Sequence, residues 1–375
     1  MSDRVTVALA RCAGYSAGVE SAVAGLLKAL GGIERFVARG QSVLIKPNLL
    51  TDRKPEDAVT THPEVVRALI RIVRRAGASP SVGDSPASAR KLERVWETTG
   101  FKALCREENV PLVNLEKAGS SVFSSDGCTF SIARPALDAD VIISVPKVKT
   151  HVLTTLTAGV KNLYGLVPGY QKTQLHKAHP RPSDFGRLMA EICRHVRPAL
   201  TVADAVVGME GDGPSGGTPA PLGFLAASAD PMALDLTLCR ILRIPPASVP
   251  YLAALGRAAD EAAGVEVCGA TIEEVSPASF RVPGTMGARL IPKPLVRLMA
   301  PLIWIRPSFT EACIACGQCV KTCPVSALSL EGRSRPLLNT RRCIGCCCCH
   351  EVCPVRAIVM TQSPLINFVR RGKML

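Results

Sequence analysis

Aromatic residues, long apolar runs and acidic residues are all scarce in this chain of 375 residues. Phe, Trp and Tyr together make up 4% of it, so the stacking platforms that bind single-stranded nucleic acids are few, and we expect no nucleic-acid partner. No stretch approaches the roughly 20 apolar residues needed to span a bilayer, so we expect no transmembrane segment. Lys and Arg number 45 against 31 Asp and Glu, and the net charge of +14 favours acidic partners or anionic ligands.

Familiar catalytic and targeting motifs are missing as well. The chain has no Walker motif, nucleophile elbow or HExxH sequence. Residues 211–216 formally fit G-x-G-x-x-G, but the prolines that follow cannot open a helix, so we interpret them as a flexible active-site loop or an ordinary surface loop. The first residues lack a signal-peptide apolar run, and the cysteines before residue 300 show no pairing rhythm. We therefore predict a cytoplasmic location.

Cysteine, by contrast, is abundant near the C-terminus, where one pattern occurs twice. Residues 313–324 read C-x2-C-x2-C-x3-C-P, and residues 343–354 repeat that spacing. Gaps of two residues let one short loop present three thiolates to a cubane iron–sulfur cluster, while the fourth cysteine of each run ligates the cluster of the other run. The repeat predicts two [4Fe-4S] clusters. A structural zinc site is the alternative, although zinc sites usually show two C-x2-4-C pairs rather than triplets.

Residues 306–362 resemble the bacterial-type ferredoxin family with two four-iron clusters. The resemblance implies one ligand set formed by Cys313, Cys316, Cys319 and Cys353 and another formed by Cys343, Cys346, Cys349 and Cys323. The second run also contains Cys347 and Cys348, which are out of register. We interpret them as small, polarizable filler beside the cluster. Ligand exchange or a redox-sensitive thiol pair is the alternative.

Residues 1–285 alternate β-branched runs with amphipathic stretches, which predicts an α/β domain with a mostly parallel sheet and helices on both faces. Residues 286–305 are apolar but interrupted by prolines and basic residues, which favours a linker helix over an interfacial membrane helix. A small α+β ferredoxin-like domain (306–362) and a basic tail (363–375) follow. The expected strands are Val5–Ala10, Ser42–Ile45, Ser81–Gly83, Val110–Leu115, Val141–Val145, Leu200–Ala203 and Gly223–Ala227, and the expected helices are Ser16–Leu30, Pro63–Ala76, Ala89–Glu97, Asp184–Arg194 and Pro231–Leu242.

Polar residues gather where the expected strands end. Ligands of open α/β sheets bind outside the carboxyl ends of the strands, and convergent charges there are costly unless a ligand or counter-charge uses them. We interpret residues 146–151 as part of a cationic pocket for an anionic small molecule, extended by Lys172 and His176; a solvated basic loop is the alternative. The predicted substrate-binding residues are Lys46, Asn48, Asp84, Lys147, Lys149, Thr150, Lys161, Asn162, Glu210 and Asp212. His151 and Asp204 are the predicted catalytic proton carriers, although turns and helix caps explain any one of the acidic residues equally well.

Several of these segments resemble the domain-of-unknown-function 362 family across residues 40–250. The segments are Val43–Asn48, Thr61–Glu64, Gly83–Ser85, Ser144–His151, Val160–Gly165, Ala203–Asp204 and Gly211–Pro214. Members of that family often carry an appended ferredoxin domain. The resemblance implies an iron–sulfur protein of prokaryotic, often anaerobic, metabolism and leaves the reaction of the large domain open.

These observations favour an iron–sulfur oxidoreductase that passes low-potential electrons to an anionic small molecule in the α/β domain. The basic C-terminal part, with ten Lys and Arg against three Asp and Glu from residue 306 onward, predicts an acidic redox partner such as a flavodoxin or ferredoxin. One alternative is a non-enzymatic electron-transfer or assembly subunit. Another is a non-redox enzyme that acts on a carboxylate and carries structural clusters.

Overall fold

The computed structural model describes residues 5–16, 18–86, 92–255, 264–284, 304–332 and 334–364. Its centre is a ten-stranded sheet with the strand order β12-β1-β11-β10-β7-β2-β3-β4, to which β8 adds beside β10 and β9 beside β8. The strands of this sheet are β1 (Thr6–Arg11), β2 (Ser42–Pro47), β3 (Ser79–Asp84), β4 (Leu112–Asn114), β7 (Val141–Val145), β8 (Lys147–His151), β9 (Thr155–Thr157), β10 (Leu200–Glu210), β11 (Thr218–Ser228) and β12 (Glu266–Gly269). Pairing is parallel except where β11 meets β1 and β10 and where β8 meets β9.

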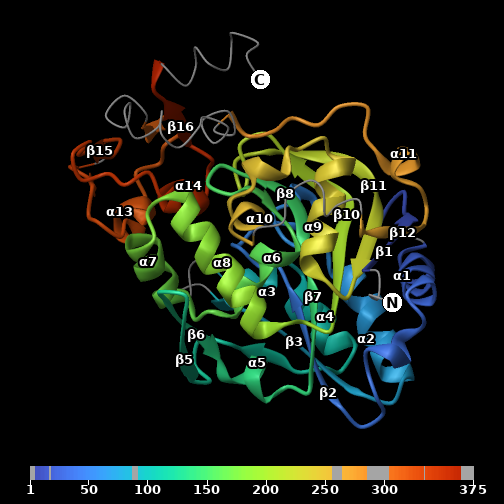
Figure 1. The fold of residues 1–375 in the computed structure, drawn as a ribbon. Helices are drawn as coiled ribbons and strands as arrows, with labels where there is room; N and C mark the ends of the chain where they lie inside the picture. Colours follow the sequence, from blue (N-terminus) through green and yellow to red (C-terminus); the bar gives the residue numbers. More distant parts are fainter. Residues whose placement is uncertain are drawn as a thin grey trace.

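Helices cover both faces of the sheet (Figure 1). They are α1 (Val19–Ala29), α2 (Pro63–Arg75), α3 (Leu92–Thr98), α4 (Phe101–Glu107), α5 (Arg134–Asp138), α6 (Gly159–Asn162), α7 (Gly169–Ala178), α8 (Pro182–Val196), α9 (Pro231–Ile241), α10 (Pro250–Ala254) and α11 (Ile272–Val275), with short 3-10 turns η1 (Ile33–Arg35), η2 (Pro55–Asp57), η4 (Leu163–Leu166) and η5 (Pro246–Ser248). A separate hairpin joins β5 (Ser120–Ser125) to β6 (Cys128–Ala133).

Two hydrophobic cores flank the sheet because successive strand residues point to opposite faces. In β2, Val43 and Ile45 pack with α1, α2 and α4, whereas Leu44 packs in the core that contains α8, α9 and α10. Both faces are therefore apolar, as strands buried on two sides require. The predicted class, an α/β fold with a mostly parallel sheet and helices on both faces, is confirmed.

The C-terminal residues form a small unit of short elements at one end of the molecule, drawn in red in Figure 1. Its elements are β13 (Ile305–Phe309), α13 (Gln318–Thr322), β14 (Leu328–Ser329), β15 (Leu337–Leu338), α14 (Cys348–Glu351) and β16 (Ile358–Gln362). Strands β13 and β16 pair antiparallel, as do β14 and β15. The predicted linker at 286–305 falls outside the described residues except for its last two, and the predicted tail at 363–375 does so except for its first two. In the described part of the chain, no helix is long and apolar enough to cross a bilayer.

Polar contacts hold this unit against the α/β domain. Arg53 donates to the carbonyl of Cys353 at 3.2 Å, and Arg356 forms an ion pair with Asp57 at 2.8 Å. In the glycine-rich loop after β10, the hydroxyl of Ser215 contacts the carbonyls of residues 350 and 351 at 3.2 and 3.1 Å, within hydrogen-bonding distance of both. The loop that we interpreted as an active-site or surface loop thus contacts the unit that carries the cysteine runs.

Candidate functional site

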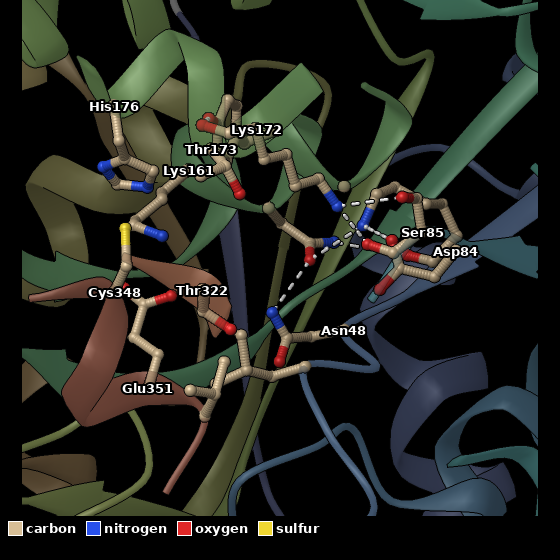
Figure 2. A pocket seen from close by; sticks show the side chains of 16 residues that line it. Asn48, Asp84, Ser85, Lys161, Lys172, Thr173, His176, Thr322, Cys348 and Glu351 are labelled. Carbon is tan, nitrogen blue, oxygen red and sulfur yellow. Dashed lines mark hydrogen bonds and ion pairs between the residues drawn. The ribbon is translucent and has the colours of Figure 1, made fainter. Parts of the chain in front are cut away.

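A pocket lies between the carboxyl ends of β2 and β3 and the C-terminal unit. It has a volume of about 60 Å³, enough for a small anion or several water molecules. The α/β domain contributes Lys46, Asn48, Leu50, Asp84, Ser85, Lys161, Asn162, Tyr164, Gly165, Lys172, Thr173 and His176, and the C-terminal unit contributes Thr322, Cys348, Glu351 and Val352. The pocket is therefore completed only when both parts of the chain are in place (Figure 2).

An ion pair and an amide form the floor of this pocket. The Lys46 ammonium lies 2.7 Å from Asp84 Oδ1 and donates to Asn162 Oδ1 at 3.1 Å. Asp84 Oδ2 accepts from the backbone of Leu49 at 2.6 Å, which fixes the carboxylate. Burial lowers the pKa of Lys46, and the Asp84 carboxylate opposes that shift. A Cβ on Gly165 would overlap both charged groups, so only glycine permits this close approach.

Two further lysines bring positive charge to the pocket wall. Lys172 donates to the hydroxyl of Ser85 at 3.0 Å, and burial lowers its pKa to about 8. The Lys161 ammonium lies over the ring of Tyr164 at 5.9 Å and has no hydrogen-bond acceptor among the described residues. Burial also lowers the pKa of Lys161, while Glu351 and Cys348 act to raise it. Among the described residues, Lys46 is thus the pocket lysine that pairs with a carboxylate, whereas Lys172 contacts only the uncharged Ser85 and Lys161 has no hydrogen-bond acceptor.

His176 lies at the same wall in an aromatic setting. Its ring stacks on Phe185 with centroids 4.4 Å apart and meets Tyr164 edge-on. The side chain is 5% exposed, and its Nδ1 has no hydrogen-bond partner among the residues that the structure describes. Burial lowers the pKa of His176 to about 4, so the ring is neutral at pH 7.

The predicted catalytic residue His151 stands behind the pocket wall rather than in it. Its Nδ1 accepts from the backbone of Leu153 at 3.0 Å, which places the proton of a neutral ring on Nε2. That Nε2 lies 3.1 Å from Glu351 Oε1, off-line for a hydrogen bond, and neither atom has another partner in the described part of the chain. Burial lowers the pKa of His151 to about 3. His151 thus contacts the pocket through Glu351, which does line it.

The other predicted catalytic residue, Asp204, belongs to a separate buried cluster. Its carboxylate lies 2.6 Å from the ammonium of Lys147, and both side chains are fully buried. Tyr15 donates to Oδ1 at 2.7 Å, and the backbone of His62 donates to Oδ2 at 2.9 Å. Neither Asp204 nor Lys147 lines the pocket.

The remaining predicted residues are distributed around the pocket. Lys149 is buried and donates to Asn48 Oδ1 at 2.9 Å, so it positions a pocket residue from behind. Thr150 Oγ1 accepts from the backbone of Gly213 at 3.3 Å. Glu210 pairs with Arg281 at 2.8 Å, and Asp212 Oδ1 accepts from the backbone of residue 284, both away from the pocket. Of the ten predicted binding residues, the structure brings Lys46, Asn48, Asp84, Lys161 and Asn162 to the pocket wall.

Two further cavities lie within the C-terminal unit, and each is lined by one of the implied four-cysteine sets. The outer cavity contains Cys313, Cys316, Cys319 and Cys353, and the inner cavity contains Cys323, Cys343, Cys346 and Cys349. The rest of each lining is mainly apolar, as a cubane cluster requires. Within the described residues, no three Cys, His or carboxylate groups converge closely enough to hold a single metal ion. Four cysteines in a mainly apolar lining are the donor set that a [4Fe-4S] cluster uses.

Sequence reasoning missed the contribution of the C-terminal unit to the pocket. Cys348 and Glu351 stand between the predicted ligand cysteines, where the sequence indicates filler beside a cluster or a redox-sensitive thiol pair and no pocket wall. The signal was a difference between the two runs, because Gln318 and Lys321 occupy the corresponding positions of the first run. If the two cysteine runs served only to hold equivalent clusters, their residues at these two positions would have no need to differ. Departures between internal repeats are therefore where a second role should be sought.

Comparisons with known proteins agree with both halves of this description. Residues 43–240 match the family described as Domain of unknown function (DUF362), and residues 312–362 match the 4Fe-4S dicluster domain. A thylakoid-associated protein of Synechocystis sp. is 40% identical over 256 residues, which cover 67% of this chain and 79% of that protein.

Two solved structures show weaker similarity. The lactate racemase apoprotein of Thermoanaerobacterium thermosaccharolyticum gives a TM-score of 0.42 at 14% identity, covering 63% of this chain and 57% of that one. A structural-genomics crystal structure of a Thermotoga maritima protein gives a TM-score of 0.36 at 14% identity, covering 66% of this chain and 58% of that one.

Proposed function

This chain belongs to the DUF362 family and carries a 4Fe-4S dicluster domain, and from that premise we propose that it is an oxidoreductase that exchanges electrons with a small anion bound in the pocket. One observation carries the proposal. Thr322 and Cys348 line the pocket, and each directly precedes a cysteine of the inner cavity, Cys323 and Cys349. These two residues thus form a wall between the pocket and the inner cavity, and Val352 of the pocket lining directly precedes a cysteine of the outer cavity, Cys353.

We propose that the outer and inner cavities each hold one [4Fe-4S] cluster through their four cysteines. Such clusters supply single electrons at potentials set by their surroundings. The shared wall is formed by short elements, α13 and α14, whose ends carry both the cysteines and the pocket residues. This arrangement explains why an electron-transfer domain is fused to the α/β domain in one chain.

The anion would bind through the lysines of the pocket, and they are not equivalent. Lys46 is already paired with Asp84, and Lys172 is held by Ser85. Lys161 has no such partner, so a bound carboxylate or other oxyanion gains most from it. Burial acts to raise the pKa of Glu351, but His151 and Lys161 hold it well below the ordinary carboxyl value, so Glu351 would present a charged carboxylate at the wall, with His151 as the positioning residue behind it. Asp204 takes no part in this scheme, because it does not reach the pocket.

Replacing Lys161 by methionine tests this proposal. The variant keeps the apolar stem and loses the charge, so the affinity of the reconstituted protein for acetate, phosphate or sulfite should fall by more than about tenfold, the size expected for one charge-assisted contact. Calorimetry measures the binding of all three anions, and reoxidation of the reduced protein by sulfite, the one reducible anion among them, follows the reaction. Lys102→Met is the matched control, because Lys102 pairs only with exposed glutamates.

The competing function gives a different result in the same experiments. A non-enzymatic carrier would be reoxidised by proteins alone, and neither its anion affinity nor its reoxidation would respond to Lys161→Met. Activity that survives removal of the clusters would instead support a non-redox enzyme.

The lowered pKa of Lys172 predicts a pH dependence of anion binding. An ordinary lysine keeps its charge to pH 10, but burial lowers the pKa of Lys172 to about 8. The ammonium is present below that pH and is lost above it, so anion affinity should decrease as the pH rises from 7 to 9. In Lys172→Met the affinity should be lower at pH 7 and nearly flat over this range. An unchanged slope in the variant would assign the titration to another group.

The outer cavity suggests where an electron carrier docks. Cys316 is exposed, and the neighbouring Ile314 and Val355 are 62% and 37% exposed. Lys321 and Arg341 are exposed in the same unit. We propose that an acidic flavodoxin or ferredoxin binds this basic, partly apolar surface. The rate of reduction by flavodoxin should then fall steeply with added salt, and Lys321→Glu should slow it further.

We propose a cytoplasmic location for the protein. The relative in Synechocystis sp. is named as thylakoid-associated, which points to attachment at a membrane surface as the competing location. Fractionation separates the two: a cytoplasmic protein stays in the supernatant at low salt, whereas a surface-bound one sediments with membranes until salt or alkali releases it.

A further inference from the structure

The two cysteines that are out of register in the second run point to different places. Cys347 lines the inner cavity together with the four predicted ligands, whereas Cys348 lines the pocket. The divergence arises because Cys347 has a positive φ of 63° and helix α14 begins at the next residue, so consecutive side chains leave in different directions. Cys348 is thus a buried thiol beside the anion pocket and outside the implied ligand set.

A second, independent feature of the same pocket indicates that a ligand belongs there. Within the described parts of the chain, Nδ1 of His176 has no hydrogen-bond partner, although its side chain is 5% exposed and lines the pocket. Buried polar atoms are almost always hydrogen-bonded, so one that faces a pocket is explained by a ligand or ordered water. Figure 2 shows His176, Lys161 and Cys348 on one side of the pocket, across from Asp84 and Ser85. An uncompensated ammonium, an unpartnered imidazole and a thiol therefore occupy one wall.

The chemistry of a thiol narrows the kind of anion that would use this wall. Carboxylates and phosphates form no bond with a thiol, and the lysines alone would suffice to hold them. An anion that contains a sulfur–sulfur bond is different, because thiols attack one of its sulfur atoms. The S–S bond of such an adduct can also be cleaved by two electrons. This suits a pocket that lies directly beside the inner cavity, where we propose that a cluster is bound.

We propose that Cys348 is a nucleophilic thiol that captures an anionic disulfide-type compound in the pocket. Its sulfur bonds to one sulfur of the S–S group, the original S–S bond breaks, and the departing sulfur takes the thiol proton, so this exchange involves no net oxidation or reduction. Two electrons from the reduced carrier of the proposed function and two protons from solvent then return the Cys348 thiol and release the captured half as a thiol. The inference rests on the proposed function and names its substrate class.

Two small disulfide-type probes of opposite charge test this inference: tetrathionate, a dianion, and cystamine, a dication. The reconstituted full chain is treated anaerobically with its clusters oxidised, and modified cysteines are mapped by mass spectrometry. Tetrathionate should modify Cys348 at least about tenfold faster than cystamine, because positive charge raises the local concentration of anions. Dithiothreitol should reverse the modification. Cys268, which is partly exposed on the α/β domain, provides the reference rate.

Matched variants make the outcome decisive. Cys348→Ser should abolish the modification, whereas Cys347→Ser should preserve it. Lys161→Met should reduce the preference for tetrathionate over cystamine. The visible absorbance of the clusters shows whether each variant is intact. Equal rates for the two probes, or modification of Cys268 alone, would overturn the inference. If anions still bind in a manner that depends on Lys161 while Cys348 remains unmodified, only this inference fails. If that binding is also absent, the proposed function fails with it.

Discussion

Replacing Cys323 by alanine should remove one cluster and leave the other. The reconstituted protein is expected to bind about eight irons per chain, and the variant about four. Cys323 belongs to the first run in sequence, but it lines the inner cavity with three cysteines of the second run. The loss should therefore affect the cluster beside the pocket. Iron and sulfide analysis together with electron paramagnetic resonance of the reduced protein measure the change.

Two matched variants give this experiment its controls. Cys353→Ala should remove the outer cluster instead, because Cys353 lines the outer cavity with three cysteines of the first run. Cys347→Ser should keep about eight irons, because Cys347 lies beside the inner cavity but outside the implied ligand set. Retention of both clusters in Cys323→Ala together with loss of iron in Cys347→Ser would contradict the crossed assignment. Binding of about one zinc without a reducible visible band would contradict the clusters altogether.

The functional consequences of the two cysteine variants should also differ. Without the inner cluster, electrons entering at the outer cavity have no carrier next to Thr322 and Cys348, so reoxidation by pocket anions should stop. Without the outer cluster, a flavodoxin should reduce the protein slowly, while a small chemical reductant still serves the pocket. This difference rests on two residues of the pocket wall, Thr322 and Cys348, that directly precede cysteines of the inner cavity, against one, Val352, that directly precedes a cysteine of the outer cavity.

The sequence predicted the fold class because local patterns and global architecture agree in this chain. Apolar strands such as Val141–Val145 alternate with amphipathic helices such as Pro63–Arg75, and both observed elements lie close to the predicted ranges. The strands β8, β9 and β12 were not predicted. They are short, and the Lys147–His151 strand is almost entirely polar, so its pairing with β10 comes from tertiary contacts rather than from a β pattern.

The candidate site was only partly predictable for a related reason. Carboxyl ends of neighbouring parallel strands meet, which correctly placed Lys46 and Asp84 together. Whether a charged side chain faces a cavity or a buried counter-charge depends on its neighbours in space. Lys147 and Lys149 lie two apart on one strand and turn to different partners, Asp204 and Asn48. The contribution of Glu351 required knowing how the C-terminal unit docks, and no local pattern contains that information.

Replacing Asp204 by alanine should destabilise the α/β domain rather than change the chemistry of the pocket. The Lys147 ammonium would remain in a fully buried position without a counter-charge. Breaking a buried ion pair by removing one partner typically costs about 3–5 kcal/mol of unfolding free energy. The hydroxyl of Tyr15 and the backbone N–H of His62 would lose their acceptor as well. Denaturant unfolding followed by circular dichroism should show a clear shift of the midpoint, and folded Asp204→Ala should bind anions as the unmodified protein does.

The double variant Lys147→Met, Asp204→Leu separates a structural role from a catalytic one. Apolar groups of similar size leave no charge unpaired, so much of the lost stability should return. Asp138→Ala is the surface control, because Asp138 pairs with Arg134 only at 4.0 Å and is exposed; its unfolding midpoint should hardly move. A stable double variant that still exchanges electrons with pocket anions would establish that Asp204 is structural. If the double variant were stable but no longer reacted with pocket anions, Asp204 would be a proton carrier, as its position at the end of a strand predicts. It would then act on the pocket from a buried cluster that does not line the pocket.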